Sequence, residues 1–423
     1  MIDIKLIRQD REKYKQACKD KNIFADIARL LAVDDELREA KQKLQDIVTE
    51  KNIIGKSIPN LELDEKKAAL DNLALLKDQE AEFNEKTKKL EPEFDHLLLY
   101  VAQPADDDVP FGKDDTENIE IRKEGQVREF DFEPKDHMQL ALDLDIIDVE
   151  RGVKLAGTRS YFLKGDGALL HWAVLRFATD FMTQKGYVPM SVPLLMRDEA
   201  MKGTGYFPGA EEQTYQMERD ALSLVGTSEV PLTAYYMNEI LPEDELPKKF
   251  FAMSSCFRRE AGSAGKDTYG LYRIHQFDKV EQVVICKNDP EQSRKFHEEI
   301  LANSEGVLKA LGLPYRIVNV CSGDLGRGQA KKFDIETWMP SRGNYCETHS
   351  ASKFYDFQAR RMNLRYKDSQ AKKNTFCHTL NNTVIATPRV LIPIMELYQN
   401  ADGSITIPEV LRPYMGGKEK ITK

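Results

Sequence analysis

The sequence predicts an α+β protein, in which a pair of long helices is followed by a larger domain containing a β-hairpin. Two observations lead to this prediction. Apolar residues recur at helical spacing through residues 30–101, and two strand-like runs flank a Gly-rich turn in residues 250–286. The 423 residues are enough for two domains, and 41% hydrophobic with 31% charged residues is typical of a soluble globular protein.

Composition narrows the class of protein further. The net charge of −9 means that a nucleic-acid partner would require locally clustered Lys and Arg. The six cysteines are scattered without a C-x-x-C pair, which argues against a zinc site or a disulfide framework. No apolar run approaches the ~18 residues of a membrane span, and the N-terminus lacks the apolar core of a signal peptide. We therefore expect a cytoplasmic protein without a membrane segment.

The N-terminal part has the pattern of an antiparallel helical arm. After a basic, weakly helical start, apolar residues from Leu30 to Ile47 and from Ala69 to Val101 form two coiled-coil seams. The loop of residues 51–60 should break the first helix with Gly55 and Pro59. A dimerising or purely structural coiled coil is the commoner role of such a pattern. The acidic linker of residues 104–125 ends the arm, and we place the boundary between domains 1–114 and 115–423.

The predicted hairpin carries polar side chains on strands that should be buried. Residues 250–257 and 271–286 read as the two strands, and the turn between them contains Gly262, Ser263, Gly265, Lys266, Asp267 and Gly270. Side chains two apart share a face, which groups Arg258 with Glu260, and Arg273 and His275 with Phe277, Lys279 and Glu281. An aromatic ring for a purine, arginines for phosphates and a carboxylate for an ammonium form a plausible ligand platform. The alternative is a half-exposed hairpin with cross-strand ion pairs.

The hairpin's FRREAG and GLYRIHQFDKVE resemble the second signature motif of class II aminoacyl-tRNA synthetases, and in this wording the seryl-tRNA synthetase family. The resemblance covers essentially the whole chain and implies a catalytic domain built on a mainly antiparallel sheet flanked by helices. It also implies a homodimer through the first class II motif. Further segments that resemble the family are DVPFGKD (108–114), the first motif (186–208), GTSE (226–229), GDLGRGQAKKFDIETWM (323–339), YCETHSASK (345–353) and the third motif (378–417).

The resemblance implies an ATP site with two catalytic arginines. Arg258 would clamp the α-phosphate, and Arg389 would stack on adenine opposite Phe277 and reach the terminal phosphate. Glu347 and Ser350 would help to hold a Mg²⁺ between ATP phosphates. His349 stands where family members commonly carry Ser. The complete expected set of ATP-binding residues is Arg258, Arg259, Glu260, Arg273, Phe277, Glu347, Thr348, His349, Ser350 and Arg389.

The resemblance also implies a serine pocket and a tRNA-binding arm. Glu281 would bind the substrate ammonium, and the arm would grip the variable region of tRNA(Ser), with tRNA(Sec) as an open second partner. The expected serine-binding residues are Thr227, Ser228, Glu229, Glu281, Asn381 and Thr383. Lysines of the arm that could contact phosphates are Lys41, Lys43, Lys51, Lys56, Lys66 and Lys67.

The implied activity is ATP-dependent formation of seryl-adenylate followed by transfer of the seryl group to the 3′-terminal adenosine of tRNA. A synthetase for another small amino acid is the nearest alternative, disfavoured by the TSE and NNT elements. A non-catalytic tRNA-binding paralogue should have lost Arg258, Glu260 or Arg389, all of which are present. An enzyme that charges a carrier protein would be expected to lack the arm.

Overall fold

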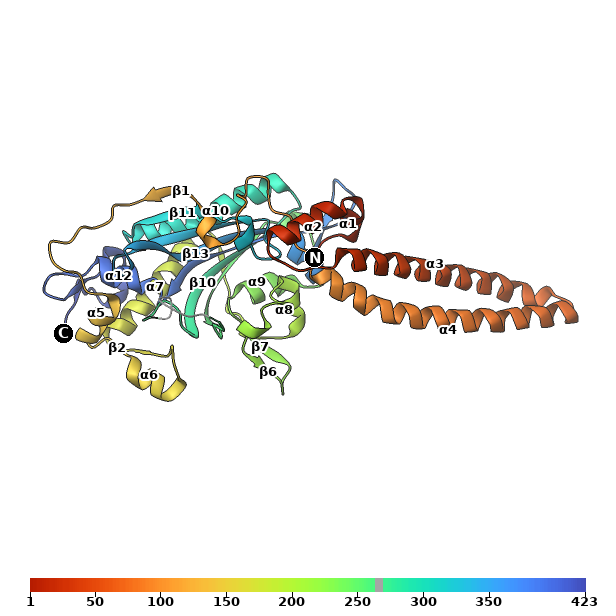
Figure 1. The fold of residues 1–423 in the computed structure, drawn as a ribbon, viewed down its shortest axis with the longest axis horizontal. Helices are drawn as coiled ribbons and strands as arrows, with labels where there is room; N and C mark the ends of the chain where they lie inside the picture. Colours follow the sequence, from red (N-terminus) through yellow and green to blue (C-terminus); the bar gives the residue numbers. More distant parts are fainter. Residues whose placement is uncertain (263–268) are drawn as a thin grey trace. The chain divides into compact units, whose positions relative to one another are not determined.

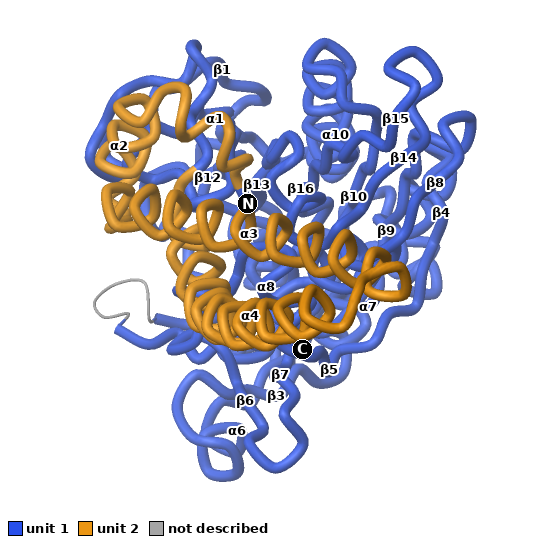
Figure 2. The backbone as a smooth tube through the Cα atoms, turned by 90° about the vertical axis from the view of Figure 1, so that its right-hand side faces the viewer, with its two compact units in different colours: residues 1, 103–423 blue, residues 2–102 orange. Residues whose placement is uncertain are grey.

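The computed structural model describes residues 1–262 and 269–423, which divide into two compact units (Figure 2). One unit is Ile2–Ala102, and the other is Gln103–Lys423 with Met1. Ser263, Gly265, Lys266 and Asp267, to which we assigned turn chemistry, lie outside the described residues. In the part of the chain that is described, no helix has the length and apolarity needed to cross a membrane.

The N-terminal unit is helical, and two long helices form its arm (Figure 1). The expected first seam is confirmed, because Leu30, Val33, Leu37, Ala40 and Ile47 are all buried. Val33 and Leu37 pack against Leu90 of the returning helix. The helices of this unit are α1 (Ile4–Gln9), α2 (Arg11–Asp20), α3 (Ile27–Ser57) and α4 (Leu63–Leu99).

The turn of the arm lies later than the sequence suggested. Helix α3 continues through Gly55 to Ser57, and the chain reverses through a short 3-10 turn that contains Pro59. A mid-helix glycine costs only about 1 kcal/mol, whereas proline cannot donate the next helical hydrogen bond. An ion pair between Lys51 and Glu80 joins the two helices close to the tip and favours the longer α3.

The larger unit is built on an eight-stranded sheet, and the expectation of a mainly antiparallel sheet is confirmed. Every neighbouring pair is antiparallel except β4 and β9, which run parallel. In spatial order the strands are β1 (Ile119–Glu124), β11 (Tyr315–Asn319), β12 (Lys331–Met339), β13 (Asn344–Tyr355), β16 (His378–Thr387), β10 (Gln276–Cys286), β9 (Lys248–Phe257) and β4 (Val188–Pro189).

Helices α7 (Asp166–Gln184) and α10 (Pro290–Ala310) cover one face of this sheet. Strand alternation separates the two faces of β10. Val280 and Val284 belong to the core cluster shared with these helices. Phe277, Lys279 and Glu281 lie on the opposite face and line a cleft. One strand therefore carries both the core and polar groups of the candidate site.

Smaller elements surround the sheet and complete the unit. The remaining helices are α5 (His137–Asp143), α6 (Val149–Ala156), α8 (Asp198–Thr204), α9 (Glu229–Thr233), α11 (Phe357–Met362) and α12 (Leu391–Leu397). The remaining strands are β2 (Ile147–Asp148), β3 (Phe162–Leu163), β5 (Leu195–Met196), β6 (Gln216–Met217), β7 (Leu222–Leu224), β8 (Ile240–Leu241), β14 (Arg365–Asp368), β15 (Lys373–Phe376), β17 (Ile405–Thr406) and β18 (Lys420–Ile421).

The segment that we read as a linker is largely part of the larger unit. Gln103 N donates to Arg327 O at 2.9 Å, and Asp106 N donates to Ala330 O at 2.9 Å. Further on, β1 pairs with β11 instead of forming linker. These backbone bonds explain why the compact units divide after Ala102, earlier than the boundary that we placed after residue 114.

The second strand of the hairpin begins at Gln276, not at residue 271. Leu271 and Tyr272 instead belong to the buried core cluster, and the pairing of β10 with β9 starts only at Gln276. The expected shared face is therefore wrong for His275, which lines a different hollow and contacts Arg258 O through Nδ1 at 3.1 Å. Arg273 also precedes the strand but still lines the cleft.

Candidate active site

The face of the sheet opposite α7 and α10 carries a cleft with about 890 Å³ of empty space, including its mouth. Its lining comes from β10, β13 and β16, from the segments 258–260 and 271–274 of the hairpin, and from the start of α9. The structure brings together at this cleft the following residues expected from the sequence: Thr227, Glu229, Arg258, Glu260, Arg273, Phe277, Glu281, Glu347, Thr348, His349, Ser350, Asn381, Thr383 and Arg389.

Two expected residues do not line this cleft. Ser228 is fully buried, and its hydroxyl forms a hydrogen bond with that of Ser254 at 2.9 Å. Arg259 is exposed, and its backbone N donates to Gln213 O at 2.9 Å. Neighbouring side chains in an extended segment point to opposite sides, so Arg258 and Arg259 cannot both enter the cleft from one strand end. Direct substrate contact by Ser228 or Arg259 stays a prediction.

One end of the cleft concentrates guanidinium groups. Arg258 lies over the ring of Phe277, with 5.1 Å between its Cζ and the ring centroid. Arg273 donates to a Glu260 carboxylate oxygen at 3.0 Å. Glu260 has a φ of 52°, a left-handed conformation that places the carboxylate beside Arg273 rather than along the strand. Guanidinium groups held in fixed geometry are well suited to phosphate oxygens.

The third arginine enters from the turn after β16. Arg389 lies over the ring of Tyr272 at 4.4 Å, and its Nε donates to Tyr272 O at 3.1 Å. Its Nη1 donates to Glu347 O at 3.1 Å. Desolvation acts to raise the pKa of the Glu347 carboxyl, but the charges of Arg389, Lys332 and Arg258 outweigh it and lower that pKa. Two carboxylates, Glu260 and Glu347, and three arginines thus share one end of the cleft.

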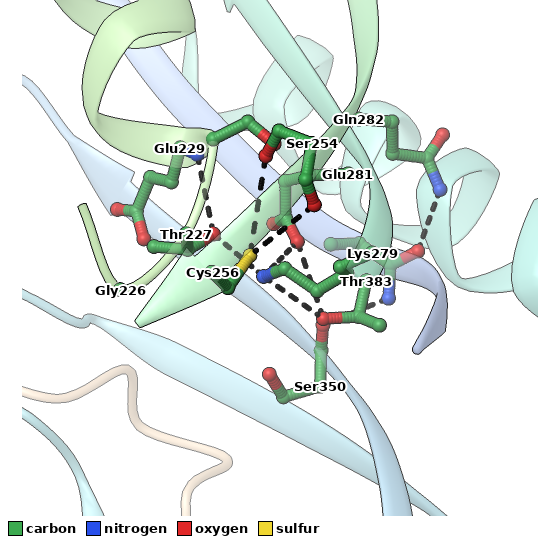
Figure 3. A network of polar contacts seen from close by, with 12 residues as sticks. Gly226, Thr227, Glu229, Ser254, Cys256, Lys279, Glu281, Gln282, Ser350 and Thr383 are labelled. Atoms are coloured by element: carbon green, nitrogen blue, oxygen red, sulfur yellow. Dashed lines mark hydrogen bonds and ion pairs between the residues drawn. The ribbon is translucent and has the colours of Figure 1, made fainter. Parts of the chain in front are cut away.

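The other end holds a compact polar network centred on Lys279 (Figure 3). The buried Lys279 Nζ donates to Thr227 Oγ1 at 2.5 Å and to Thr383 Oγ1 at 3.4 Å, and forms an ion pair with Glu281. Thr383 Oγ1 in turn donates to Glu281 at 3.2 Å. One buried ammonium group therefore holds two hydroxyls and a carboxylate in place. These contacts offset the cost of burying the charges of Lys279 and Glu281.

Glu229 is a second buried carboxyl at this end. Tyr206 OH donates to it at 3.1 Å and Gln358 Nε2 at 2.8 Å. Burial raises the pKa of Glu229 to about 7, and the neighbouring Glu281 charge acts in the same direction. The side-chain amide nitrogen of Asn381 is buried without a hydrogen-bond partner among residues 1–262 and 269–423. A buried donor beside a cleft is an available contact for a polar ligand.

Sequence reasoning missed several residues that shape the cleft. Lys279 was placed on the correct strand face by its period-two spacing, but no role was assigned to it. Tyr206 and Tyr272 are far apart in sequence and meet the cleft only through the tertiary fold. Tyr272 stands next to Arg273 in the quoted motif, so the motif was the available signal.

Comparisons with known proteins agree with this geometry. A family model described as the seryl-tRNA synthetase N-terminal domain matches residues 1–103, and one described as the tRNA synthetase class II core domain (G, H, P, S and T) matches residues 213–398. A serine–tRNA ligase of Deinococcus radiodurans is 44% identical over 426 residues, which cover 99% of this chain and 98% of that protein. The chain belongs to the seryl-tRNA synthetase family.

Solved structures of this family share the fold. The seryl-tRNA synthetase from Pyrococcus horikoshii, complexed with ATP, matches with a TM-score of 0.93 and 34% identity, covering 100% of this chain and 99% of that chain. A cytoplasmic serine–tRNA ligase from Naegleria fowleri, complexed with AMP, matches with a TM-score of 0.87 and 33% identity, with the same coverage. The expected family and fold are confirmed, whereas the roles of individual residues in this chain stay predictions.

The expected metal residues have a suitable donor set for Mg²⁺. Glu347 and Ser350 supply a carboxylate and a hydroxyl at the cleft, and the lowered pKa keeps Glu347 ionised. Among the described residues, no group of three or more His, Cys, Asp or Glu side chains could hold a metal alone. Mg²⁺ often binds through one or two protein ligands together with phosphates and water, so this site fits it. Burial lowers the pKa of His349 to about 3, which makes its ring neutral.

Replacing Glu229 with Gln should remove a pH-dependent part of the stability. A pKa raised from 4.5 to about 7 means that the folded chain binds this proton more tightly than the unfolded chain. The resulting stabilisation is present below the unfolded pKa and is lost as pH rises through the folded one. Relative to Glu229→Gln, the wild type should therefore lose free energy of unfolding between pH 4.5 and 7 in urea titrations. A difference that stays constant over this range would contradict the assignment.

Proposed function

We propose that this chain is a serine–tRNA ligase that activates L-serine with ATP and transfers the seryl group to the 3′-terminal adenosine of tRNA(Ser). The observation that carries the proposal is the division of one cleft into two ends. Arg258, Arg273 and Arg389 gather at one end, and the network around Lys279 and Glu281 lies at the other. Relatives named serine–tRNA ligase that match over nearly their full length support the same activity.

In the first step, a carboxylate oxygen of serine bonds to the α-phosphorus of ATP while the bond to the bridging oxygen of pyrophosphate breaks. Arg258 would contact the α-phosphate and the attacking carboxylate, and Arg389 the terminal phosphate. Glu260 and Arg273, already paired at 3.0 Å, would fix the nucleotide. No protein nucleophile is required, because orientation and stabilisation of developing charge supply most of the rate.

Adenine would stack between Phe277 and Arg389. In the structure Arg258 lies over Phe277 and Arg389 lies over Tyr272. Adenine would replace the Arg258 guanidinium over Phe277, and its other face would meet Arg389, which stays over Tyr272. Glu347 and Ser350 would hold Mg²⁺, which when bound neutralises phosphate charge.

Serine selection would come from the opposite end. Glu281 would accept from the substrate ammonium, and Glu229 with Thr227 would accept further hydrogen bonds. Asn381 and Thr383 would contact the serine hydroxyl or carboxylate, and the unpartnered amide nitrogen of Asn381 supports such a role. A pocket built to bond a hydroxyl rejects alanine strongly, because its own polar groups would be left unpaired.

The second step requires tRNA, which the arm would bind. Lys41 and Lys43 form ion pairs with Glu91 at 2.7 Å and Glu39 at 2.9 Å, whereas Lys56, Lys66 and Lys67 are exposed near the tip. The tip therefore offers positive charge that is the more accessible to phosphates. We propose the unit Ile2–Ala102 as the tRNA-binding domain and the unit Gln103–Lys423 as the catalytic domain, with tRNA(Sec) as a second substrate to be tested.

We further propose a cytoplasmic homodimer that forms through the first motif. Trp172 of α7 is 61% exposed, Val188 of β4 is 53% exposed and Leu195 of β5 is 45% exposed. Large apolar side chains exposed on neighbouring segments are typical of an interaction surface. The cytoplasmic location is supported by the six cysteines, which form no disulfide in the structure, and by the cytoplasmic relative from Naegleria fowleri.

The decisive test of the activity is amino-acid-dependent ATP–pyrophosphate exchange with each standard amino acid. Serine should support exchange, and alanine should be at least ~10⁴-fold less effective because the pocket's polar groups would stay unpaired. Charging of purified tRNA(Ser) and tRNA(Sec) should follow with serine. Exchange with another amino acid instead of serine would refute the proposal, and absence of exchange with all of them would indicate a non-catalytic relative.

Arg258→Ala and Arg389→Ala should each lower the serine-dependent exchange rate by at least ~10²-fold, the scale of removing one electrostatic stabiliser of a transition state. Arg151→Ala is a matched control, because Arg151 is an exposed arginine of α6 that forms a surface ion pair with Asp148. It should exchange at the wild-type rate. If either cleft variant is folded by circular dichroism and exchanges as fast as the control, the assigned role is wrong.

Replacing residues 34–100 with a short Gly/Ser linker should separate the two steps. Exchange should persist, because no residue assigned to ATP or serine lies in that stretch. Charging of tRNA should collapse, and binding of tRNA to the intact protein should weaken with salt by roughly one unit of log–log slope per phosphate contacted. Loss of exchange would mean that the arm supports the cleft, and unchanged charging would make the arm purely structural.

A further inference from the structure

We propose that His137, held by Glu396, is a positioning residue for the ATP site. The pair lies behind the cleft and orients Tyr272, and through it Arg389, for nucleotide binding. The inference rests on the proposed function, which assigns ATP to this end of the cleft. Neither His137 nor Glu396 lines the cleft.

Glu396 is a fully buried carboxylate that joins two distant segments. It accepts four hydrogen bonds: two from His137, through its backbone N at 3.0 Å and its ring Nδ1 at 2.8 Å, and two from Ser341, through its backbone N at 2.9 Å and its hydroxyl at 2.7 Å. A buried carboxylate with this number of donors holds its neighbours in a narrow range of positions. Helix α12, which carries Glu396, begins just after Arg389.

The ring of His137 connects Glu396 to Leu271, which begins the segment that enters the cleft. Its Nε2 accepts from the backbone N of Leu271 at 3.3 Å. Because Nε2 accepts and Nδ1 faces the carboxylate, the proton lies on Nδ1 and the ring is neutral. Gly270 allows the approach: it has a φ of +65°, and a Cβ there would lie 2.1 Å from Nε2.

Both segments held by Glu396 converge on Tyr272. Leu271 precedes Tyr272 in sequence, and Arg342, which follows Ser341, places its Cζ 3.9 Å from the Tyr272 ring centroid. Arg389 lies 4.4 Å from the same ring and donates to the Tyr272 carbonyl. The position of Arg389 therefore depends on the position of Tyr272. His137 and Glu396 fix Tyr272 through its neighbours Leu271 and Arg342.

This arrangement acts on the nucleotide end alone. The serine network of Thr227, Lys279, Glu281 and Thr383 is attached to β10, β16 and the start of α9 and shares no hydrogen bond with His137 or Glu396 among the described residues. A purely stabilising role of the pair would lower the melting temperature without separating the two substrates. A positioning role should weaken ATP binding and leave serine binding unchanged.

The test compares His137→Leu, His137→Gln and Glu396→Gln with the wild type. His137→Leu removes both ring hydrogen bonds, whereas His137→Gln keeps an amide oxygen for the Leu271 N–H and an amide N–H for Glu396. ATP dissociation constants are measured by calorimetry with Mg²⁺, and KM values for ATP and serine by exchange. The matched control is His378→Leu, since His378 is also buried and hydrogen-bonded, to Ser293 at 2.7 Å, at the start of β16.

His137→Leu should weaken ATP binding about tenfold, the equivalent of about 1.4 kcal/mol, and leave the KM for serine within about twofold. His137→Gln should recover most of the loss, Glu396→Gln should resemble His137→Leu, and His378→Leu should bind ATP normally. ATP affinity unchanged in both His137→Leu and Glu396→Gln, or equal losses for ATP and serine, would overturn the inference. Should His137→Leu not fold, wild-type ATP affinity in Glu396→Gln would overturn it. Because ATP binding is measured directly, absent serine-dependent exchange in a wild type that binds ATP would refute only the proposed function.

Discussion

Strand β10 carries charged side chains on one face and core side chains on the other. This constraint determines where the cleft and the core of the larger unit lie. Val280 and Val284 are fully buried beneath α7 and α10, while Lys279 and Glu281 are buried on the opposite face. Buried charges are tolerated only when paired and hydrogen-bonded, and here the pairing partners are each other and the hydroxyls of Thr227 and Thr383. The polar network at this end of the cleft therefore follows from the pairing that two buried charges on one strand require.

The sequence allowed prediction of those features that repeat locally or belong to a long motif. The arm seams follow from heptad spacing, and Leu30, Val33 and Leu37 are buried as expected. The face of Phe277, Lys279 and Glu281 follows from strand periodicity, because side chains two apart share a side. Family resemblance supplied the remaining cleft residues, and fourteen of the sixteen expected ATP- and serine-binding residues line one cleft.

The sequence could not supply features that depend on distant partners. Helix α3 passes Gly55 because its partner α4 continues alongside, and β1 becomes a strand because β11 offers a free edge. The second hairpin strand starts late because Leu271 is bonded to His137, which lies 134 residues away in sequence. Tyr206 and the Glu396 network reach the cleft or its support through the same long-range packing, and no local pattern indicates them.

The charges of the cleft match those of its proposed ligands. At the proposed serine end, the charge of Lys279 balances that of Glu281. Burial raises the pKa of Glu229 to about 7, so this carboxyl is only partly ionised near neutral pH. A zwitterionic amino acid can enter without adding net charge. At the other end, the charged residues that line the described part of the cleft are Arg258, Arg273, Arg389, Glu260 and Glu347. The arginines outnumber the carboxylates, which suits a polyanion. The two ends therefore favour ligands of different charge.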